Sequence, residues 1–281
     1  MKKFLVTWFI LIFCGVTVGC KRDNFETTTP NELNKKQSIR TLDNYPNSTQ
    51  KAKQQSNQMS YQYPLNISTT TYLRKEKRPD GKVVNVTNYP SSIGVIVNKK
   101  IYLPKNYVPK DLIYPNTTFL FKEKVEKRKL RREAALQLEK MFTAAKKDGI
   151  NLSGVSGYRS YATQTVVFNN YVKRDGYQKA ITYSAIPGTS EHQTGLAIDV
   201  SGTDGKCAVT SCFAATKEAK WLEKNSANYG YIIRFPKGKE HVTGYKYEPW
   251  HIRYVGTGIA KDMQARGLTL EEYFGIFPIL K

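Results

Sequence analysis

The chain has 281 residues and carries 44 Lys and Arg against 23 Asp and Glu, a formal net charge of +21 at pH 7. A surface this basic favours polyanionic partners, and outside a cell these are anionic lipid head groups and wall polymers. No nucleic-acid recognition motif accompanies the charge, so we expect no nucleic-acid partner, and much of the charge is expected to be solvated surface.

The first residues have the pattern of an export signal. Two lysines precede an apolar run at 4–18, which has 15 residues and is shorter than the ~20 needed to span a bilayer. The following Cys20 lies in a stretch that resembles a bacterial lipobox, although Thr17 stands where that motif usually has Leu. The resemblance implies a lipoprotein signal peptide at 1–19 and lipidation of Cys20, at the extracytoplasmic face of a bacterial membrane of Gram-positive type. A plain cleaved signal and an uncleaved anchor are the alternatives.

The next segment, 20–60, is rich in Asn, Gln, Ser, Thr and Lys and poor in aliphatic residues. Such a segment cannot bury enough apolar surface to offset its ordering entropy, so we predict a flexible polar tether that begins at the lipidated Cys20. About 200 residues remain, which is enough for one domain with a substantial core. Nothing in them indicates an oligomer, and we expect a monomer.

Short strands are predicted first in the remaining chain. β-branched residues broken by Gly, Asn and Pro occur in GKVVNVTNYP and SSIGVIVNKKIYLP, a composition typical of short strands and turns. We expect residues 61–120 to form a β-rich extension that packs on, or enters, the domain at 121–281.

The domain itself mixes helices and strands. Apolar residues recur at three- and four-residue steps over 123–147, which predicts an amphipathic helix whose Met141 and Phe142 are packing residues. Further helices are predicted after the turn in SGYRSYATQ and at 216–225, and strands in LAIDV, YGYIIRF and WHIRYVG. This order predicts an α+β fold, a single domain in which a small, mainly antiparallel sheet has flanking helices.

Two of the four cysteines form a close pair. Cys207 and Cys212 flank AVTS, and outside the cell such a pair is expected to form a disulfide that closes a small loop. Two free thiols are the alternative. Zinc binding by this pair is disfavoured because no second Cys/His pair lies close by.

Two of the three histidines lie near carboxylates. In SEHQTGLAID, strand alternation would direct Asp199 away from the apolar layer formed by Ile198 and Val200, and a preceding turn could bring His192 back towards it. In EPWHIRYVG, Glu248 lies three residues before His251 across a proline, which argues against a helix and hence against the helical H-E-x-x-H zinc motif.

Two histidines and one aspartate make a plausible set of three ligands for catalytic zinc, with a position left open for water. Glu248 suits the role of a carboxylate that accepts the proton of that water. Each histidine taken alone is more often a hydrogen-bonded structural residue, and spacing does not decide between these interpretations.

The S-x-H-x-x-G-x-A-x-D pattern at Ser190–Asp199 resembles the signature of VanY-type zinc D-alanyl-D-alanine carboxypeptidases, whose relatives include L,D-carboxypeptidases of the bacterial wall. SGYRSYATQ at 156–164 and YEPWHIRYVG at 247–256 resemble the other two blocks of the family, in the expected order. The resemblance covers about residue 98 to the end of the chain.

The resemblance implies a role for each matching residue. One Zn²⁺ would be held by His192, Asp199 and His251, with Glu248 as the general base and Arg159 polarising the scissile carbonyl or holding a substrate carboxylate. The expected lining of the substrate cleft is Gln164, Ser190 and, as a wall or a core residue, Tyr158. The third histidine, His241, matches no ligand position and is expected to be an exposed loop residue.

The resulting hypothesis is a zinc carboxypeptidase domain at 121–281 that removes the terminal D-alanine from peptidoglycan stem peptides. The motifs do not distinguish D,D-activity on pentapeptides from L,D-activity on tetrapeptides. A wall endopeptidase on the same scaffold and a non-catalytic wall-binding lipoprotein are the rival interpretations.

Overall fold

The computed structural model describes residues 72–78 and 80–276. The predicted signal peptide, the lipidation site Cys20 and the tether to residue 60 lie outside these residues. All described residues belong to one compact unit, Met59–Lys281. Within the described part of the chain, no helix combines the length and the apolar character needed to cross a membrane.

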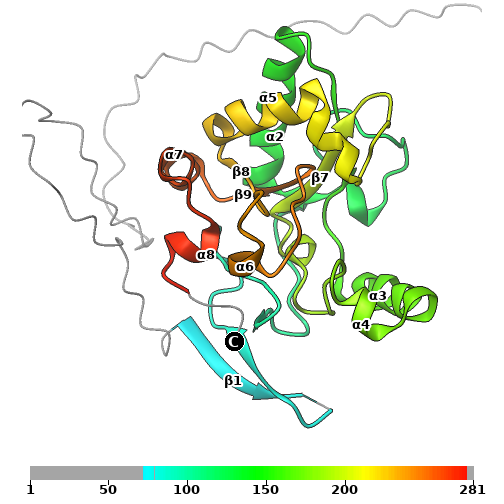
Figure 1. Ribbon diagram of the computed structural model, residues 1–281, viewed down its shortest axis with the longest axis vertical. Helices are drawn as coiled ribbons and strands as arrows, with labels where there is room; N and C mark the ends of the chain where they lie inside the picture. The colour runs from blue at the N-terminus through cyan, green and yellow to red at the C-terminus, as the bar shows by residue number, and fades with distance from the viewer. Residues whose placement is uncertain (1–71, 79, 277–281) are drawn as a thin grey trace, which may run out of the picture. The chain divides into compact units, whose positions relative to one another are not determined.

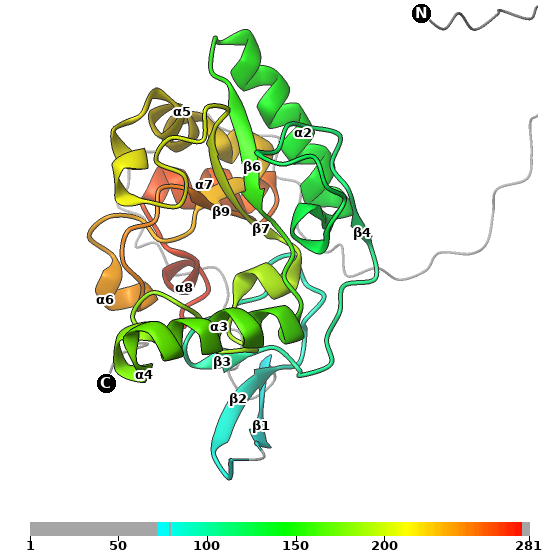
Figure 2. The ribbon, with the colours of Figure 1, turned by 90° about the vertical axis from the view of Figure 1, so that its right-hand side faces the viewer.

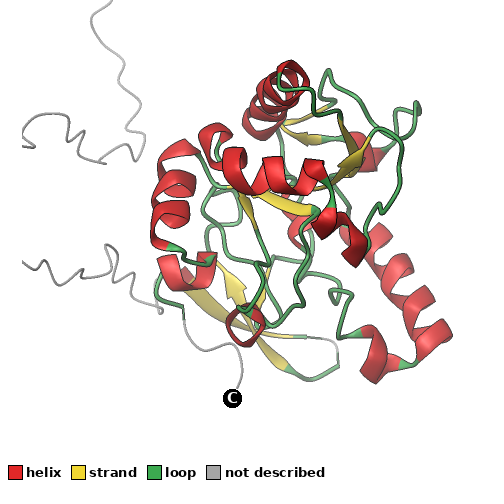
Figure 3. Cartoon of the chain, turned by 45° about the horizontal axis from the view of Figure 1, so that its top comes forward, coloured by secondary structure: helices red, strands yellow, loops and turns green. Residues whose placement is uncertain are grey.

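The central element is a four-stranded, fully antiparallel sheet in the order β6-β7-β9-β8. Its strands are β6 (Leu152–Ser156), β7 (Ala197–Gly202), β8 (Tyr231–Ile233) and β9 (His251–Tyr254). Figure 2 shows β6, β7 and β9 side by side among the helices. The three strands predicted in LAIDV, YGYIIRF and WHIRYVG are thus confirmed, as is the α+β fold with a mainly antiparallel sheet (Figure 3).

Two smaller sheets precede the central one in the chain. The first has three strands, β1 (Leu73–Lys77), β2 (Val83–Thr87) and β3 (Ile101–Tyr102), and the second has two, β4 (Leu112–Ile113) and β5 (Leu130–Arg131). β1 and β2 form an antiparallel hairpin, whereas β3 runs parallel to β2. Three apolar residues from this region, Val95, Val97 and Leu103, belong to the same buried cluster as the central sheet.

The described residues also form helices around the sheets. They are α2 (Arg132–Lys147), α3 (Tyr161–Asp175), α4 (Tyr177–Ala180), α5 (Lys217–Asn225), α6 (Glu240–Thr243), α7 (Thr257–Arg266) and α8 (Leu270–Tyr273). In Figure 1, α3 and α4 lie together, away from α2 and α5. Short 3₁₀ turns connect several elements: Glu126–Arg128, Glu191–Thr194, Ser211–Ala215 and Ser226–Tyr229.

The helix predicted from residue 123 begins only at Arg132. Leu130 and Arg131 instead form strand β5, which pairs with β4. Their backbone groups are used in this strand pair, so the helix starts after them. The apolar periodicity beyond this point was interpreted correctly, since Leu138, Met141 and Phe142 are all buried. Periodicity alone could not locate the start, because Leu130 is buried whether it lies on a strand or on a helix.

Side-chain caps fix the start of α3 and α5. The Ser160 hydroxyl accepts a hydrogen bond from the backbone N–H of Thr163 at the start of α3, and the Thr216 hydroxyl accepts one from Ala219 at the start of α5. The expected disulfide is also present: Cys207 and Cys212 are bonded, with their Cα atoms 5.4 Å apart.

Two leucines of α2 provide a matched test of this packing. Leu138 is fully buried, whereas Leu136 is 45% exposed. We expect Leu138→Ala to lower the free energy of unfolding by about 2–5 kcal/mol, because it leaves a cavity in the core. Leu136→Ala should change it by less than about 0.5 kcal/mol. Urea denaturation measures both, and equal losses would contradict the assignment of the buried face.

Candidate active site

The register of the central sheet brings two parts of the sequence together. In the antiparallel pair β7–β9, Asp199 lies directly opposite His251. Directly opposed residues project their side chains from the same face of a sheet. Nδ1 of His251 consequently lies 3.0 Å from Oδ1 of Asp199.

The turn before β7 brings in the second histidine. His192 lies in the 3₁₀ turn Glu191–Thr194, which ends at Gly195 with φ 67°. A Cβ at Gly195 would lie 2.8 Å from a methyl carbon of Leu112, so this left-handed position accepts only glycine without rearrangement. The reversal at Gly195 places Nε2 of His192 3.4 Å from Oδ2 of Asp199.

His192, Asp199 and His251 are suited to holding a metal ion. All three are buried, and one ligand atom from each lies within 4.8 Å of the other two. Two ligand atoms on a tetrahedral zinc ion are about 3.3–3.5 Å apart, close to the observed separations. His192 donates its Nδ1–H to the carbonyl oxygen of Gly157 at 2.8 Å, which fixes the tautomer and leaves Nε2 free to bind a metal.

These residues line a cavity of about 680 Å³, here called the main cleft. Its walls also contain Glu248, Arg159, Ser190, Tyr245, Tyr247 and Trp250. Burial raises the pKa of Glu248 to about 7, against the opposing effect of His251. A carboxylate with such a pKa can both accept and release a proton near neutral pH.

Arg159 is held in the main cleft by its neighbours. Its Nη1 donates to Oε1 of Gln164 at 2.8 Å, and its Nη2 lies 3.2 Å from the hydroxyl of Ser156. Gln164 itself is buried, and its amide nitrogen donates to the carbonyl oxygen of Ala185. The structure therefore places Gln164 behind Arg159, where it orients the guanidinium, and not in the cleft wall expected from the sequence.

The other expected residues are placed as follows. Ser190 is buried and lines the main cleft. Tyr158 is buried but lies outside the cleft lining. Burial raises the pKa of its hydroxyl, and the nearby Glu126 and Tyr107 act in the same direction. The structure thus places Tyr158 in the packing of the domain. His241 is exposed, as expected, but lies on the short helix α6 and not in a loop.

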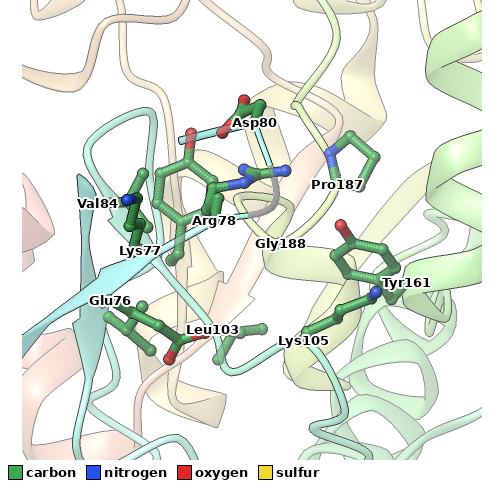
Figure 4. Close-up of a pocket in the computed structure, with 12 residues that line it drawn as sticks. Glu76, Lys77, Arg78, Asp80, Val84, Leu103, Lys105, Tyr161, Pro187 and Gly188 are labelled. Carbon is green, nitrogen blue, oxygen red and sulfur yellow. The ribbon is translucent and has the colours of Figure 1, made fainter. Parts of the chain in front are cut away.

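A second cavity of about 220 Å³ lies apart from these groups. Figure 4 shows Arg78 from the end of β1, Tyr161 at the start of α3 and Gly188 around it. None of the residues expected to act in catalysis lines this cavity. The candidate catalytic and metal-binding residues are therefore concentrated in the main cleft.

Comparison with known proteins gives a consistent result. The family model described as VanY, D-alanyl-D-alanine carboxypeptidase, matches residues 127–257. YodJ of Bacillus subtilis (strain 168) is 49% identical over 203 residues, which are 72% of this chain and 74% of YodJ. The chain belongs to the VanY family.

Solved structures agree with this assignment. The L,D-carboxypeptidase LdcB is 46% identical, with a TM-score of 0.69, and the match covers 76% of this chain and 97% of that one. A zinc complex of a variant of the D,D-pentapeptidase VanY is 32% identical, with a TM-score of 0.52, over 64% of this chain and 97% of that one. The protein is therefore a VanY-family zinc peptidase with a His-Asp-His candidate metal site.

One residue of this VanY-family site was missed by the sequence reasoning. Oε2 of Glu191 lies 3.5 Å from Nε2 of His251, on the side of the ring away from Asp199. Oε1 of Glu191 accepts hydrogen bonds from Arg234 at 2.7 Å and from Arg253 at 2.6 Å. The two arginines are 43 and 62 residues away in the chain, so no local pattern could have identified their partner.

The buried ion pairs keep Glu191 charged. Burial acts to raise the pKa of Glu191, but Arg234 and Arg253 outweigh it and hold the pKa well below its usual range. Arg234 is paired on its other side with Glu271 at 2.6 Å. A charged Glu191 can therefore accept the Nε2–H of His251 and orient its ring, as outer carboxylates commonly do for metal-binding histidines.

Two glutamates of this network provide a matched pair of variants. Glu191→Gln should weaken zinc binding about 10- to 100-fold, because it removes the carboxylate that orients His251. Glu271→Gln disturbs the same buried arginine but does not reach His251, so its zinc affinity should stay within about threefold of the parent value. Competition with a chromophoric chelator measures both affinities in folded protein. Equal weakening in the two variants would refute the direct role of Glu191.

The charge of His251 predicts a pH dependence of zinc binding. Burial acts to lower the pKa of His251, but hydrogen bonds to Asp199 and Glu191 outweigh it and raise the pKa to about 9. Burial lowers the pKa of His192 to about 3, so His192 is already neutral at pH 7. Zinc binds the unprotonated ring nitrogen, so binding at pH 7 must release the proton of His251.

We therefore expect release of about one proton from His251, and a zinc affinity that rises by up to about tenfold per pH unit from pH 7 towards pH 9. Calorimetric titration in buffers of different ionisation enthalpy counts the protons. No proton release, together with an affinity that is constant between about pH 6 and 8, would show that His251 is neutral before zinc binds.

Proposed function

We propose that this protein is a carboxypeptidase that uses one zinc ion per chain to remove the terminal D-alanine from peptidoglycan stem peptides. The observation that carries the proposal is the meeting of His192, Asp199 and His251 with Glu248 and Arg159 in one cleft. A structural metal site would need neither the carboxylate of raised pKa nor the guanidinium.

Among stem peptides, the tetrapeptide is the favoured substrate. LdcB, whose structure is titled as that of an L,D-carboxypeptidase, resembles this chain more than the D,D-pentapeptidase VanY does, with 46% against 32% identity. An enzyme of the LdcB kind removes the last residue where it follows an L-centre, whereas a D,D-enzyme acts on the pentapeptide.

Glu248 transfers the proton in this mechanism. Zinc bound by the triad would supply Lewis-acid activation of the water and of the scissile carbonyl. Glu248 accepts the proton of the attacking water on its carboxylate and donates it to the departing amine. Its pKa of about 7 reflects the partial burial of this carboxylate in the wall of the main cleft.

In this mechanism Arg159 binds the substrate. Its guanidinium has donors left over after the bonds to Gln164 and Ser156, and these can reach a peptide carboxylate or a developing oxyanion. Because Gln164 fixes the guanidinium before substrate arrives, little of its side-chain freedom is lost on binding.

We further propose that the protein acts at the outer face of the bacterial membrane, tethered through a lipid on Cys20. The support is the basic start, the apolar run and the cysteine at its end. Sensitivity of its processing to globomycin tests the tether, and processing unaffected by globomycin would exclude it.

The activity is tested on zinc-loaded protein with disaccharide tetrapeptide and disaccharide pentapeptide, followed separately by mass spectrometry. We expect loss of one alanine from the tetrapeptide. Glu248→Ala should retain zinc but lose turnover by several orders of magnitude, because the proton acceptor is gone.

Other products would overturn parts of the proposal. Loss of alanine from the pentapeptide alone would make the protein a D,D-carboxypeptidase, and internal fragments would make it an endopeptidase. Intact substrates in both reactions would favour a wall-binding protein, and a fully active, zinc-loaded Glu248→Ala variant would remove Glu248 from the mechanism.

A further inference from the structure

The disulfide-closed segment Cys207–Cys212, here called the disulfide loop, lies in the wall of the main cleft. It follows β7, the strand that carries Asp199, and leads into the 3₁₀ turn Ser211–Ala215. Val209, Thr210 and Ser211 line the same cavity as Glu248 and the metal triad. The loop is therefore placed beside the reacting groups.

The backbone of the disulfide loop is strained at Val209. The N–H of Thr210 donates to the carbonyl oxygen of Cys207 at 3.3 Å, which makes Val209 the third residue of a tight turn. Its φ is 55°, and Cys207 has φ 58°; within the described residues these are the non-glycine positions with positive φ. Gly or Asn usually occupies such a turn position, and a β-branched residue there is unfavourable.

Packing of the core does not account for the valine at this position. Its side chain is 44% exposed, whereas the ends of the loop are anchored by the disulfide and by the fully buried Phe213. An exposed apolar side chain held in an unfavourable backbone conformation contributes little to folding. Strained residues of this kind are concentrated at functional sites.

The residues that line the main cleft indicate which substrate groups Val209 contacts. Val97, Val167 and Trp250 line the cleft as apolar surface between the polar groups, a composition typical of sites for small ligands. The apolar parts of a stem peptide include the methyl groups of its alanines and the methylene chain of its diamino acid. We infer that the disulfide loop is a substrate-binding element and that Val209 packs against these methyl and methylene groups. The inference rests on the proposed function.

Two substitutions separate the side chain from the backbone. Val209→Gly removes the contact and also relieves the strain, so the thermal midpoint should be unchanged or higher. Val209→Asn accepts the same left-handed backbone but replaces the apolar side chain with a polar one. For both variants we expect KM for the preferred muropeptide to rise on the order of tenfold, with kcat changed less than about twofold and zinc content unchanged.

Val166→Ala is the matched control, because Val166 on α3 is 60% exposed and lies outside the lining of the main cleft. Its KM and kcat should equal those of the parent protein. Unchanged KM in both Val209 variants would overturn the inference. Loss of zinc in either variant would also overturn it, because the loop would then act through Asp199 and not through the substrate.

Binding measurements keep the inference separate from the proposed function. Calorimetry with zinc-loaded Glu248→Ala protein, alone and combined with Val209→Gly, measures muropeptide affinity without turnover. If the parent protein cleaves or binds muropeptides and the Val209 variants bind them with equal affinity, only the inference about the disulfide loop is refuted. Failure of the parent protein to cleave or bind either muropeptide would remove both.

Discussion

Asp199 and His251 face each other across the antiparallel pair β7–β9, and the rest of the site is arranged around this contact. The register of a strand pair cannot shift by one residue without moving every side chain to the opposite face of the sheet. Burial of Ile198 and Val200 on β7 and of Ile252 on β9 therefore holds the two candidate metal ligands together. The apolar core and the polar site are specified by the same alternation.

Buried charge is the second requirement of this arrangement. A carboxylate as buried as Glu191 would take up a proton if it had no partner, and a neutral Glu191 would no longer be a strong acceptor for His251. Arg234 and Arg253 prevent this protonation, because their guanidinium nitrogens lie 2.7 and 2.6 Å from Oε1 of Glu191. Glu271 in α8 forms an ion pair with Arg234 and also accepts a hydrogen bond from Asn98. The contacts behind the ring of His251, a candidate metal ligand, therefore extend through three distant parts of the chain.

The features that depend on local pattern or on the family motifs could be predicted from the sequence. Strand alternation identified β7 and β9, and the close spacing of Cys207 and Cys212 identified the disulfide. The predicted start of α2 was wrong, because strand pairing at Leu130 overrides the helical periodicity of the sequence. The role of Glu191 could not be predicted, because its partners Arg234 and Arg253 lie far from it in the chain. The contact of Gln164 with Arg159 is local, but the contact of its amide nitrogen with Ala185 depends on the fold.

The guanidinium of Arg253 links the catalytic core to the chain that precedes it. It is fully buried in β9, and besides Glu191 it donates to the carbonyl oxygens of Ile93 and Val95, each at 2.8 Å. Without those two carbonyls, a cation in the interior would keep donors that neither water nor protein satisfies. The 127–257 segment shared with the family thus leaves out groups that satisfy its own buried cation, and the upstream chain acts as an intramolecular partner of that segment.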